Sequence, residues 1–260
     1  MRGQWIPTIG GLVVLLLLWQ AIVWWSDLPP ILLPGPVQVA TTMWQERAAL
    51  GVGVAATCAA SALGLLLSLL VGSIVALLLS QSRWLRAAIF PYVLFLQTVP
   101  IVAIAPLLTT WFGYRFRTVV LVASIISLFP IVSNVTSGLI SIDPLLLDVF
   151  RVHRASRWQI MVKLRIPHAI RYLVLGLRVS TGLAIIGAIV GELFVGDAVN
   201  RFAGLGTLIS AWQRMARTDA VMGAIVASTL LGISLLSIVN LLCDNLLARW
   251  STAQEFESQR

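Results

Sequence analysis

The side chains that could perform catalysis or bind a metal are few in this sequence, and they are not grouped. There are two histidines, His153 and His168, and two cysteines, Cys58 and Cys243. His153 lies in a basic segment and His168 directly follows that segment, and neither has ligand-like partners. Both cysteines lie inside apolar stretches, where small buried hydrophobic side chains are expected. No nucleophile–base pair is present. We therefore expect neither a catalytic site nor a metal site in this chain.

The most distinctive segment is a basic, amphipathic stretch of twenty residues, 148–167, with long apolar stretches on both sides. Asp143 and Pro144 precede it and form a typical helix start, because an N-cap acceptor is followed by proline at the first helical position. A polar segment of this kind in an apolar chain is expected to be a surface on which a soluble partner acts. The alternative is an ordinary amphipathic loop at the membrane surface.

A second helix start lies inside the same segment. Ser156 and Gln159 have the spacing of an S-x-x-Q capping box, in which each residue satisfies a backbone N–H of the other. Pro167 disfavours helical geometry at Ile166, so we expect it to end this helix before the next apolar stretch. The segment should therefore form two short helices at a bend.

Composition sets the class of protein. The 260 residues are 59% hydrophobic and 11% charged, and the mean hydropathy is +0.95. A soluble domain usually carries about 25% charged residues, so an integral membrane protein is expected. The formal charge is +8, and 17 of the 18 basic residues are arginines. These arginines flank apolar stretches and form no continuous stripe, which argues against nucleic-acid binding.

Six apolar stretches are long enough to cross a bilayer as helices, which takes about 20 residues. They are continuous and do not alternate with a period of two, so helices are favoured over barrel strands. The stretches are Ile9–Trp25, Val54–Leu79, Ala87–Phe112, Thr118–Ile140, Tyr172–Val195 and Ala220–Leu247. The first continues into Trp24 and Trp25 without a small-residue cleavage site, so we expect a retained membrane helix.

The distribution of basic residues predicts the orientation. With the N-terminus in the cytoplasm, the inner segments contain 11 arginines and lysines and the outer segments contain six. Cytoplasmic loops carry the excess of such residues, so both termini and the basic segment are expected in the cytoplasm. A positive outer face favours an anionic solute through electrostatic focusing. Its arginines are Arg115, Arg117, Arg201, Arg214 and Arg217.

A few polar residues lie inside the apolar stretches. Gln97 and Thr98 lie in the third stretch, which prolines also interrupt, and Asn134 lies in the fourth. Such side chains either line a cavity or form hydrogen bonds between packed helices. Glu192 lies well within the fifth stretch, where an acid is costly and is a candidate for function. Glu192 is expected to line the path, to meet water at the outer mouth, or to pair with a basic residue. Arg178 lies fourteen residues before it in the same stretch, about four helical turns away, so a partner would come from another helix or from the second subunit.

Small residues also recur in the fifth stretch. They are Gly182, Gly187, Ala188 and Gly191. Small residues let two helices approach each other closely. Such packing fits a seam between two subunits and fits packing inside one subunit equally well.

In the basic segment, Asp148-Val149-Phe150 is followed by three residues, then Arg154, nine residues and Leu164-Arg165-Ile166-Pro167. This spacing resembles the cytoplasmic signature loop of ABC importer permeases, which reads E-A-A, three residues, G, nine residues, I, one residue, L-P. The spacing is kept, although only the final proline is identical.

Other segments are similar to the nitrate/sulfonate/taurine/bicarbonate branch of this family. They are Leu33–Pro36, Val99–Leu107, Trp111–Gly113, Gly191-Glu192 and Gly204–Gly206. The resemblance implies an all-α integral membrane protein like a type I ABC importer, with about six transmembrane helices and a cytoplasmic coupling helix between the fourth and fifth. It implies one permease domain, 1–260, with a first helix at about 9–25, a core at about 51–249, a coupling loop at about 143–167 and a C-terminal tail, 250–260.

The resemblance also implies an assembly in a bacterial inner membrane. Two permease subunits, identical or different, form the path, two cytoplasmic ATPase subunits bind ATP and Mg²⁺, and a periplasmic or lipid-anchored binding protein delivers the solute. This chain has no G-x-x-x-x-G-K-[ST] loop, so ATP must be bound by another chain. The alternative, an ion-coupled secondary carrier, would show more buried ionisable residues and an internal repeat.

By resemblance, the coupling loop contacts the ATPase. Its candidate contact residues are Asp148, Val149, Phe150, Arg151, His153, Arg154, Ala155, Ser156 and Pro167. We expect Gln97, Thr98, Asn134 and Glu192 to line the translocation path. At Arg154 the family has glycine, which permits a left-handed backbone at the helix end, and another residue there costs about 1 kcal/mol or more. Either the turn is built differently, or Arg154 contacts an acid on the ATPase.

Overall fold

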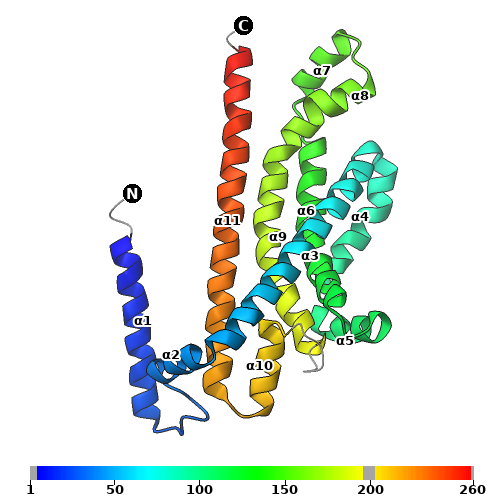
Figure 1. The fold of residues 1–260 in the computed structure, drawn as a ribbon. Coiled ribbons are helices and arrows are strands. Elements are labelled where there is room, and N and C mark those ends of the chain that lie inside the picture. The colour runs from blue at the N-terminus through cyan, green and yellow to red at the C-terminus, as the bar shows by residue number, and fades with distance from the viewer. Residues whose placement is uncertain (1–4, 196–202, 259–260) are drawn as a thin grey trace.

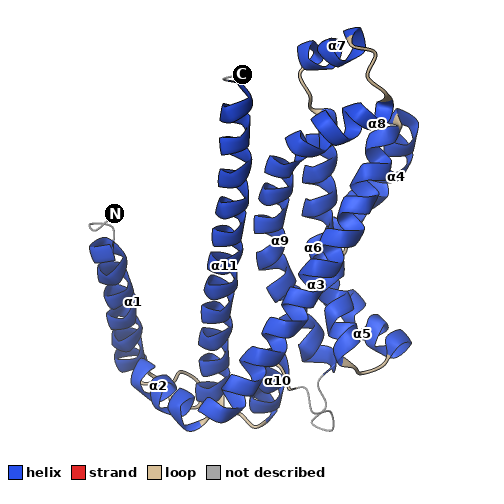
Figure 2. Ribbon diagram, turned by 45° about the horizontal axis from the view of Figure 1, so that its top comes forward, coloured by secondary structure: helices blue, strands red, loops and turns tan. Residues whose placement is uncertain are grey.

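The computed structural model describes residues 5–195 and 203–258, with side chains for 10–195 and 203–248. Every regular element in these ranges is a helix, as the continuous apolar stretches predict (Figure 1, Figure 2). The helices are α1 (Trp5–Ser26), α2 (Pro36–Gln45), α3 (Arg47–Gln81), α4 (Arg83–Thr98), α5 (Ile101–Phe112), α6 (Phe116–Ile140), α7 (Pro144–Val152), α8 (Arg157–Ile160), the π-helix η1 (Met161–Arg165), α9 (Ile166–Val195), α10 (Leu205–Arg214) and α11 (Thr218–Ser258).

The core forms where α6 packs between α3 and α9. Glycines make this close packing possible at Ala123 of α6. A Cβ added to Gly64 of α3 would lie 2.6 Å from Ala123 Cβ, and one added to Gly187 of α9 would lie 2.7 Å from Ala123 Cα. Gly187 therefore packs inside the subunit, whereas an added Cβ at Gly182 would have nothing within 4 Å.

Four helical segments are continuous, long and apolar enough to cross a membrane, against the six that the sequence predicts. They are Arg47–Gln81, Phe116–Ile140, Arg157–Val195 and Thr218–Ala248. The described apolar part of α1, Gly10–Ser26, is shorter. A broken pair, α4 and α5, raises the number of candidate spans to five if it is counted as one.

The prediction that the third apolar stretch is one continuous helix is wrong. α4 and α5 are bent by 98° at Val99-Pro100. Pro100 supplies no N–H for a continuing helix, and it favours an extended backbone at the residue before it. Val99 accordingly has φ −72° and ψ 124°. Pro91 and Pro106 lie inside α4 and α5 without ending them.

The prediction that Pro167 ends its helix is also wrong. The segment α8–η1–α9 is one helical rod of 39 residues, Arg157–Val195. Just before Pro167, the Ile166 N–H bonds to the carbonyl of Met161, five residues earlier. The wider π-helical turn accommodates a proline ring that would collide with the carbonyl four residues earlier in a regular α-helix.

Different short helices lie at the two ends of the bundle. Figure 1 shows α7, α8 and the C-terminal end of α11 at one end, and α2, α5 and α10 at the other. α1 packs against α2 and stands apart from the core. Residues 250–258, expected as a tail, continue α11 as a helix. The short helices α2 and α10 have no counterpart among the predicted stretches.

Candidate functional site

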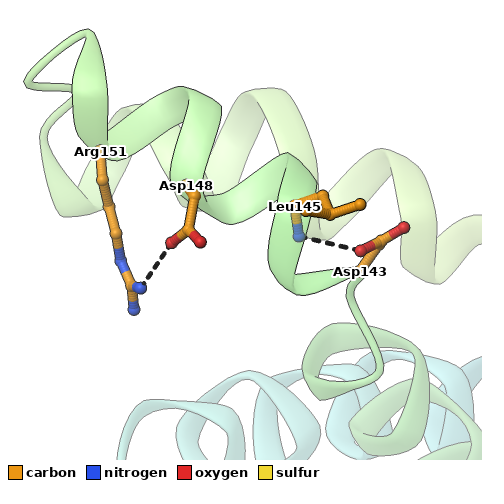
Figure 3. Close-up of polar contacts among 4 residues, drawn as sticks. All are labelled: Asp143, Leu145, Asp148 and Arg151. Carbon is orange, nitrogen blue, oxygen red and sulfur yellow. Dashed lines mark hydrogen bonds and ion pairs between the residues drawn. The ribbon is translucent and has the colours of Figure 1, made fainter.

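Both predicted helix starts of the basic segment are confirmed. Asp143 Oδ1 accepts the Leu145 N–H at 2.9 Å and begins α7 (Figure 3). At the start of α8, the Ser156 N–H donates to Gln159 Oε1 at 2.7 Å, and the Gln159 N–H donates to Ser156 Oγ at 3.2 Å. The capping box is therefore complete, and each short helix has its first free N–H groups satisfied.

α7 projects from the bundle, and none of its residues is buried. Leu145, Val149 and Val152 are 74%, 54% and 80% exposed. Their spacing of four and three residues places them on one face of the helix. Phe150, by contrast, is half-buried. An apolar stripe of this kind at the edge of a polar segment is suited to contact with another protein.

The polar side of α7 is held by weak local contacts. Arg151 Nη1 lies 2.9 Å from Asp148 Oδ1, and both side chains are more than 60% exposed (Figure 3). His153 Nδ1 lies 2.8 Å from the carbonyl oxygen of Val149. Exposed ion pairs contribute little to stability, so the charges of Asp148 and Arg151 remain accessible to a partner.

Arg154 takes the left-handed backbone that the family builds with glycine. Its φ is +50°. The Arg154 N–H donates to the Arg151 carbonyl and the Ala155 N–H donates to the Phe150 carbonyl, both at 2.9 Å. These two bonds form a Schellman motif, which normally has glycine at this position. The turn is therefore not built differently, and in the described part of the chain no acid forms an ion pair with Arg154.

The coupling residues are not all brought together. Asp148 to Ser156 form α7 and the turn that follows it, whereas Pro167 lies beyond η1 in the first turn of α9. Pro167 thus belongs to the base of a membrane rod and not to the projecting helix. Its place favours a role in shaping the start of α9 over direct contact with a partner at α7.

A cavity of about 600 Å³ lies between α4, α5, α6 and α9. Gln97 lines it at the end of α4, beside the helix break, and Asn134 lines it from α6. Of the four residues expected on the translocation path, these two share one cavity. Thr98 and Glu192 do not line it. The Thr98 hydroxyl instead donates to the Phe95 carbonyl at 2.9 Å.

Glu192 is only 4% exposed and lies against the first turn of α10. Its Oε2 accepts the Thr57 hydroxyl and the Gly206 N–H, each at 2.9 Å. The Leu205 N–H donates to Thr57 Oγ1, also at 2.9 Å. Glu192 is thus neither in water at an outer mouth nor paired with an arginine. It binds the N-terminus of α10, where free N–H groups and the helix dipole favour a carboxylate.

Sequence reasoning missed the partners of two intramembrane charges. Thr57 is one of many hydroxyl residues in α3, and nothing in its local pattern indicates contact with Glu192. Arg178 Nη2 lies 2.6 Å from Asp244 Oδ1. Asp244 lies inside the sixth apolar stretch, 66 residues from Arg178. Because an acid within an apolar stretch usually pairs with a basic residue, its position could have identified it as the partner of Arg178.

Residues 64–252 match the family model described as binding-protein-dependent transport system inner membrane component. The chain belongs to this family. The permease is 34% identical over 257 residues to the riboflavin transport system permease protein RibX of Chloroflexus aurantiacus, an alignment that covers 97% of this chain and 93% of RibX. It is 28% identical over 258 residues to the putative aliphatic sulfonates transport permease protein SsuC of Bacillus subtilis, covering 98% and 89% of the two chains.

The fold has solved counterparts. A chain of the MetNI methionine ABC transporter in an inward-facing conformation matches with a TM-score of 0.56 and 17% identity, covering 73% of this chain and 94% of that one. Family membership makes the permease a multi-pass inner-membrane component of an importer for small solutes, which works with an ATPase and a binding protein. ATP is handled by the ATPase partner, so the permease is not an enzyme.

Family membership also decides against the ion-coupled secondary carrier, because this family's importers depend on binding proteins. Among the residues whose side chains are described, no three His, Cys, Asp or Glu lie together as metal ligands.

Proposed function

We propose that α7 is the coupling helix, and that an ATPase subunit holds it at the cytoplasmic face. The observation that carries this proposal is the exposed apolar stripe of Leu145, Val149 and Val152 on a helix that has no fully buried residue in its own subunit. ATP-driven closure of the ATPase pair would move α7 as a rigid body. The accessible charges of Asp148 and Arg151 supply polar contacts at the same surface.

Movement of α7 can reach the far end of the molecule through one element. The turn at Arg154 and the capping box at Ser156 join α7 to the rod Arg157–Val195. Near the other end of this rod, Glu192 binds α10. A continuous helix transmits displacement along its axis, whereas a flexible loop would absorb it. We propose that the rod bends at the π-helical turn η1 when α7 moves, since such turns often occur at functional sites.

The topology that fits this proposal has six crossings in one permease domain, 1–260. α1 is the first crossing and the broken α4–α5 pair is the third. α7 and the C-terminal end of α11 lie at the same end of the bundle (Figure 1), in agreement with a cytoplasmic coupling helix and C-terminus. The excess of basic residues in the inner segments supports this orientation.

Two copies of the permease, or this chain and a similar one, would enclose the path, with two ATPase subunits below and a periplasmic or lipid-anchored binding protein above. The cavity lined by Gln97 and Asn134 is the proposed part of the path within this subunit. Relatives are named for solutes of different charge. RibX is a riboflavin permease, ThiX of Halalkalibacterium halodurans, 30% identical, is a formylaminopyrimidine permease, and NrtB of Synechococcus elongatus, 26% identical, is a nitrate permease.

Cysteine cross-linking tests the coupling assignment. Val152→Cys in α7 is expected to cross-link to a co-expressed ATPase subunit, and ATP is expected to change the yield. Val37→Cys, 72% exposed in α2 at the opposite end, is the matched control and should not react with the ATPase. Cross-linking of Val37→Cys but not Val152→Cys to the ATPase would overturn the proposal.

A further inference from the structure

We infer that the cavity between α4, α5, α6 and α9 binds a flat, uncharged solute that presents an N–H group, and that Asn134 recognises this group. A heteroaromatic ring with neighbouring N–H and C=O groups has this chemistry. The inference rests on the proposed function of the cavity as part of the path and adds the chemical class of the solute.

The first argument is the charge of the lining. The residues around the cavity are Leu96, Gln97, Val99, Ile101, Ile104, Ile125, Ile126, Phe129, Pro130, Ser133, Asn134, Val179 and Leu183. None of these described residues carries a charge. An anion that leaves water without a cation or several donors pays a large desolvation cost, and a cation without an acid or an aromatic cage does the same. The outer arginines that favoured an anion, Arg115 among them, do not line this space, and Arg201 lies outside the described residues.

The second argument is the direction of the hydrogen bonds. Asn134 Nδ2 donates to the Pro130 carbonyl at 2.8 Å, which orients the amide and leaves Oδ1 as an acceptor. The cavity therefore presents an amide oxygen that can accept a hydrogen bond from a solute. This acceptor favours a solute N–H, whereas the absence of a cationic side chain from the lining disfavours an anion.

The third argument is that the cavity offers donors for a solute carbonyl and an apolar wall for a flat ring. In the described part of the chain, no hydrogen bond occupies the Gln97 amide or the Ser133 hydroxyl, so both can donate to a solute carbonyl. Phe129 contributes an aromatic ring, and aliphatic side chains, four of them isoleucines, form most of the remaining wall. A flat ring fits such a wall through stacking and dispersion. The volume of about 600 Å³ lies within the range of small-molecule sites.

The position of Asn134 is itself set by close packing. A Cβ added to Gly176 of α9 would lie 2.9 Å from the Pro130 carbonyl oxygen and 3.2 Å from Asn134 Cβ. Glycine at 176 thus lets α9 approach the same carbonyl that holds the Asn134 amide. Asn134 is held from two sides, and this rigidity suits recognition of one donor geometry.

Ligand-observed NMR on the permease–ATPase complex in lipid nanodiscs tests the inference without a binding protein. The probes are thymine (neutral, with N–H and C=O groups), benzenesulfonate (a flat anion) and choline (a cation). Saturation transfer is expected to thymine and not to the other two. Asn134→Leu should weaken thymine binding about three- to tenfold, the value of one lost hydrogen bond, and so should Gln97→Leu, whose side chain is exposed and packs little.

The matched control is Asn240→Leu, the same substitution in α11 away from the cavity, which should leave thymine binding unchanged. Asn134→Lys should gain benzenesulfonate binding, because it supplies the missing cation. Equal or stronger binding of benzenesulfonate or choline to the unmodified complex would overturn the inference, as would equal effects of Asn134→Leu and Asn240→Leu. The proposed coupling role is separate: Val152→Asp should disrupt the ATPase contact yet retain thymine binding to the permease.

Discussion

The hydroxyl of Thr57 donates to Glu192 Oε2 at 2.9 Å and accepts the Leu205 N–H at the same distance. One side chain of α3 therefore joins α9 and α10. Together, Thr57 and Glu192 satisfy the N–H groups of Leu205 and Gly206, which no helical carbonyl can reach. A buried N–H left without a partner costs about 1–3 kcal/mol, so this contact stabilises the start of α10.

Glu192→Gln and Glu192→Ala should differ sharply. Both hydrogen bonds end on a single oxygen, Oε2, and a glutamine carbonyl can accept both. Glu192→Gln should lose only the charge–dipole contribution of about 0.3–1 kcal/mol. Glu192→Ala leaves a buried N–H and a hydroxyl unsatisfied, at about 1–3 kcal/mol each. Thermal unfolding of the purified complex checks this order, and equal melting temperatures for the two variants would contradict it.

Gly204→Ala should be one of the most damaging single substitutions at this end of the molecule. An added Cβ would lie 2.1 Å from the Glu192 carboxyl carbon, and overpacking of this kind typically costs about 1–3 kcal/mol. Gly182→Ala is the matched control, because nothing lies within 4 Å of its added Cβ. That change should be neutral or stabilising, by up to about 1 kcal/mol from helix propensity. Expression level and melting temperature measure both, and equal losses would refute the packing argument.

Arg154→Gly should be tolerated and should stabilise the turn. A non-glycine residue in left-handed geometry costs roughly 1–2 kcal/mol, and glycine removes this cost. Glycine also raises the conformational entropy of the unfolded chain, which offsets about 0.4–1 kcal/mol of the gain in stability. Ala216, with φ +55° and the same pair of bonds at the end of α10, provides the control Ala216→Gly. A small rise in melting temperature is expected for both. Loss of ATPase assembly in Arg154→Gly alone would identify Arg154 as a partner contact instead.

What the sequence predicted well is local. Hydropathy located the four helical segments that are long and apolar enough to cross a membrane, because a lipid-facing helix must be apolar along its own length. Asp143 and Ser156 marked the helix starts, because a cap acts on its nearest N–H groups. The sequence around Pro100 and Pro167 does not show which of the two prolines breaks its helix. Both prolines remove an N–H, yet one breaks a helix by 98° and the other is absorbed by a π-helical turn, since the surrounding packing decides.

The candidate sites follow the same division. The spacing of the basic segment was sufficient to locate α7 and its turn. Gln97 and Asn134 were found as polar residues in apolar stretches, and they share a cavity. The contact between Thr57 and Glu192 spans 135 residues, and that between Arg178 and Asp244 spans 66. No local pattern encodes such pairs, because they depend on how three or more helices cross.

Val152→Asp should uncouple the permease from ATP hydrolysis without harming its insertion. Val152 is 80% exposed on a helix that buries none of its residues, so a charge there costs the subunit little. The same charge placed in an apolar contact with the ATPase would remain buried and unpaired, which costs about 3–5 kcal/mol in comparable cases and lowers affinity more than a hundredfold. Co-purification of the ATPase and solute-stimulated ATP hydrolysis measure the loss. Val37→Asp, equally apolar and 72% exposed in α2, should retain both, and full coupling in Val152→Asp would exclude α7 as the contact.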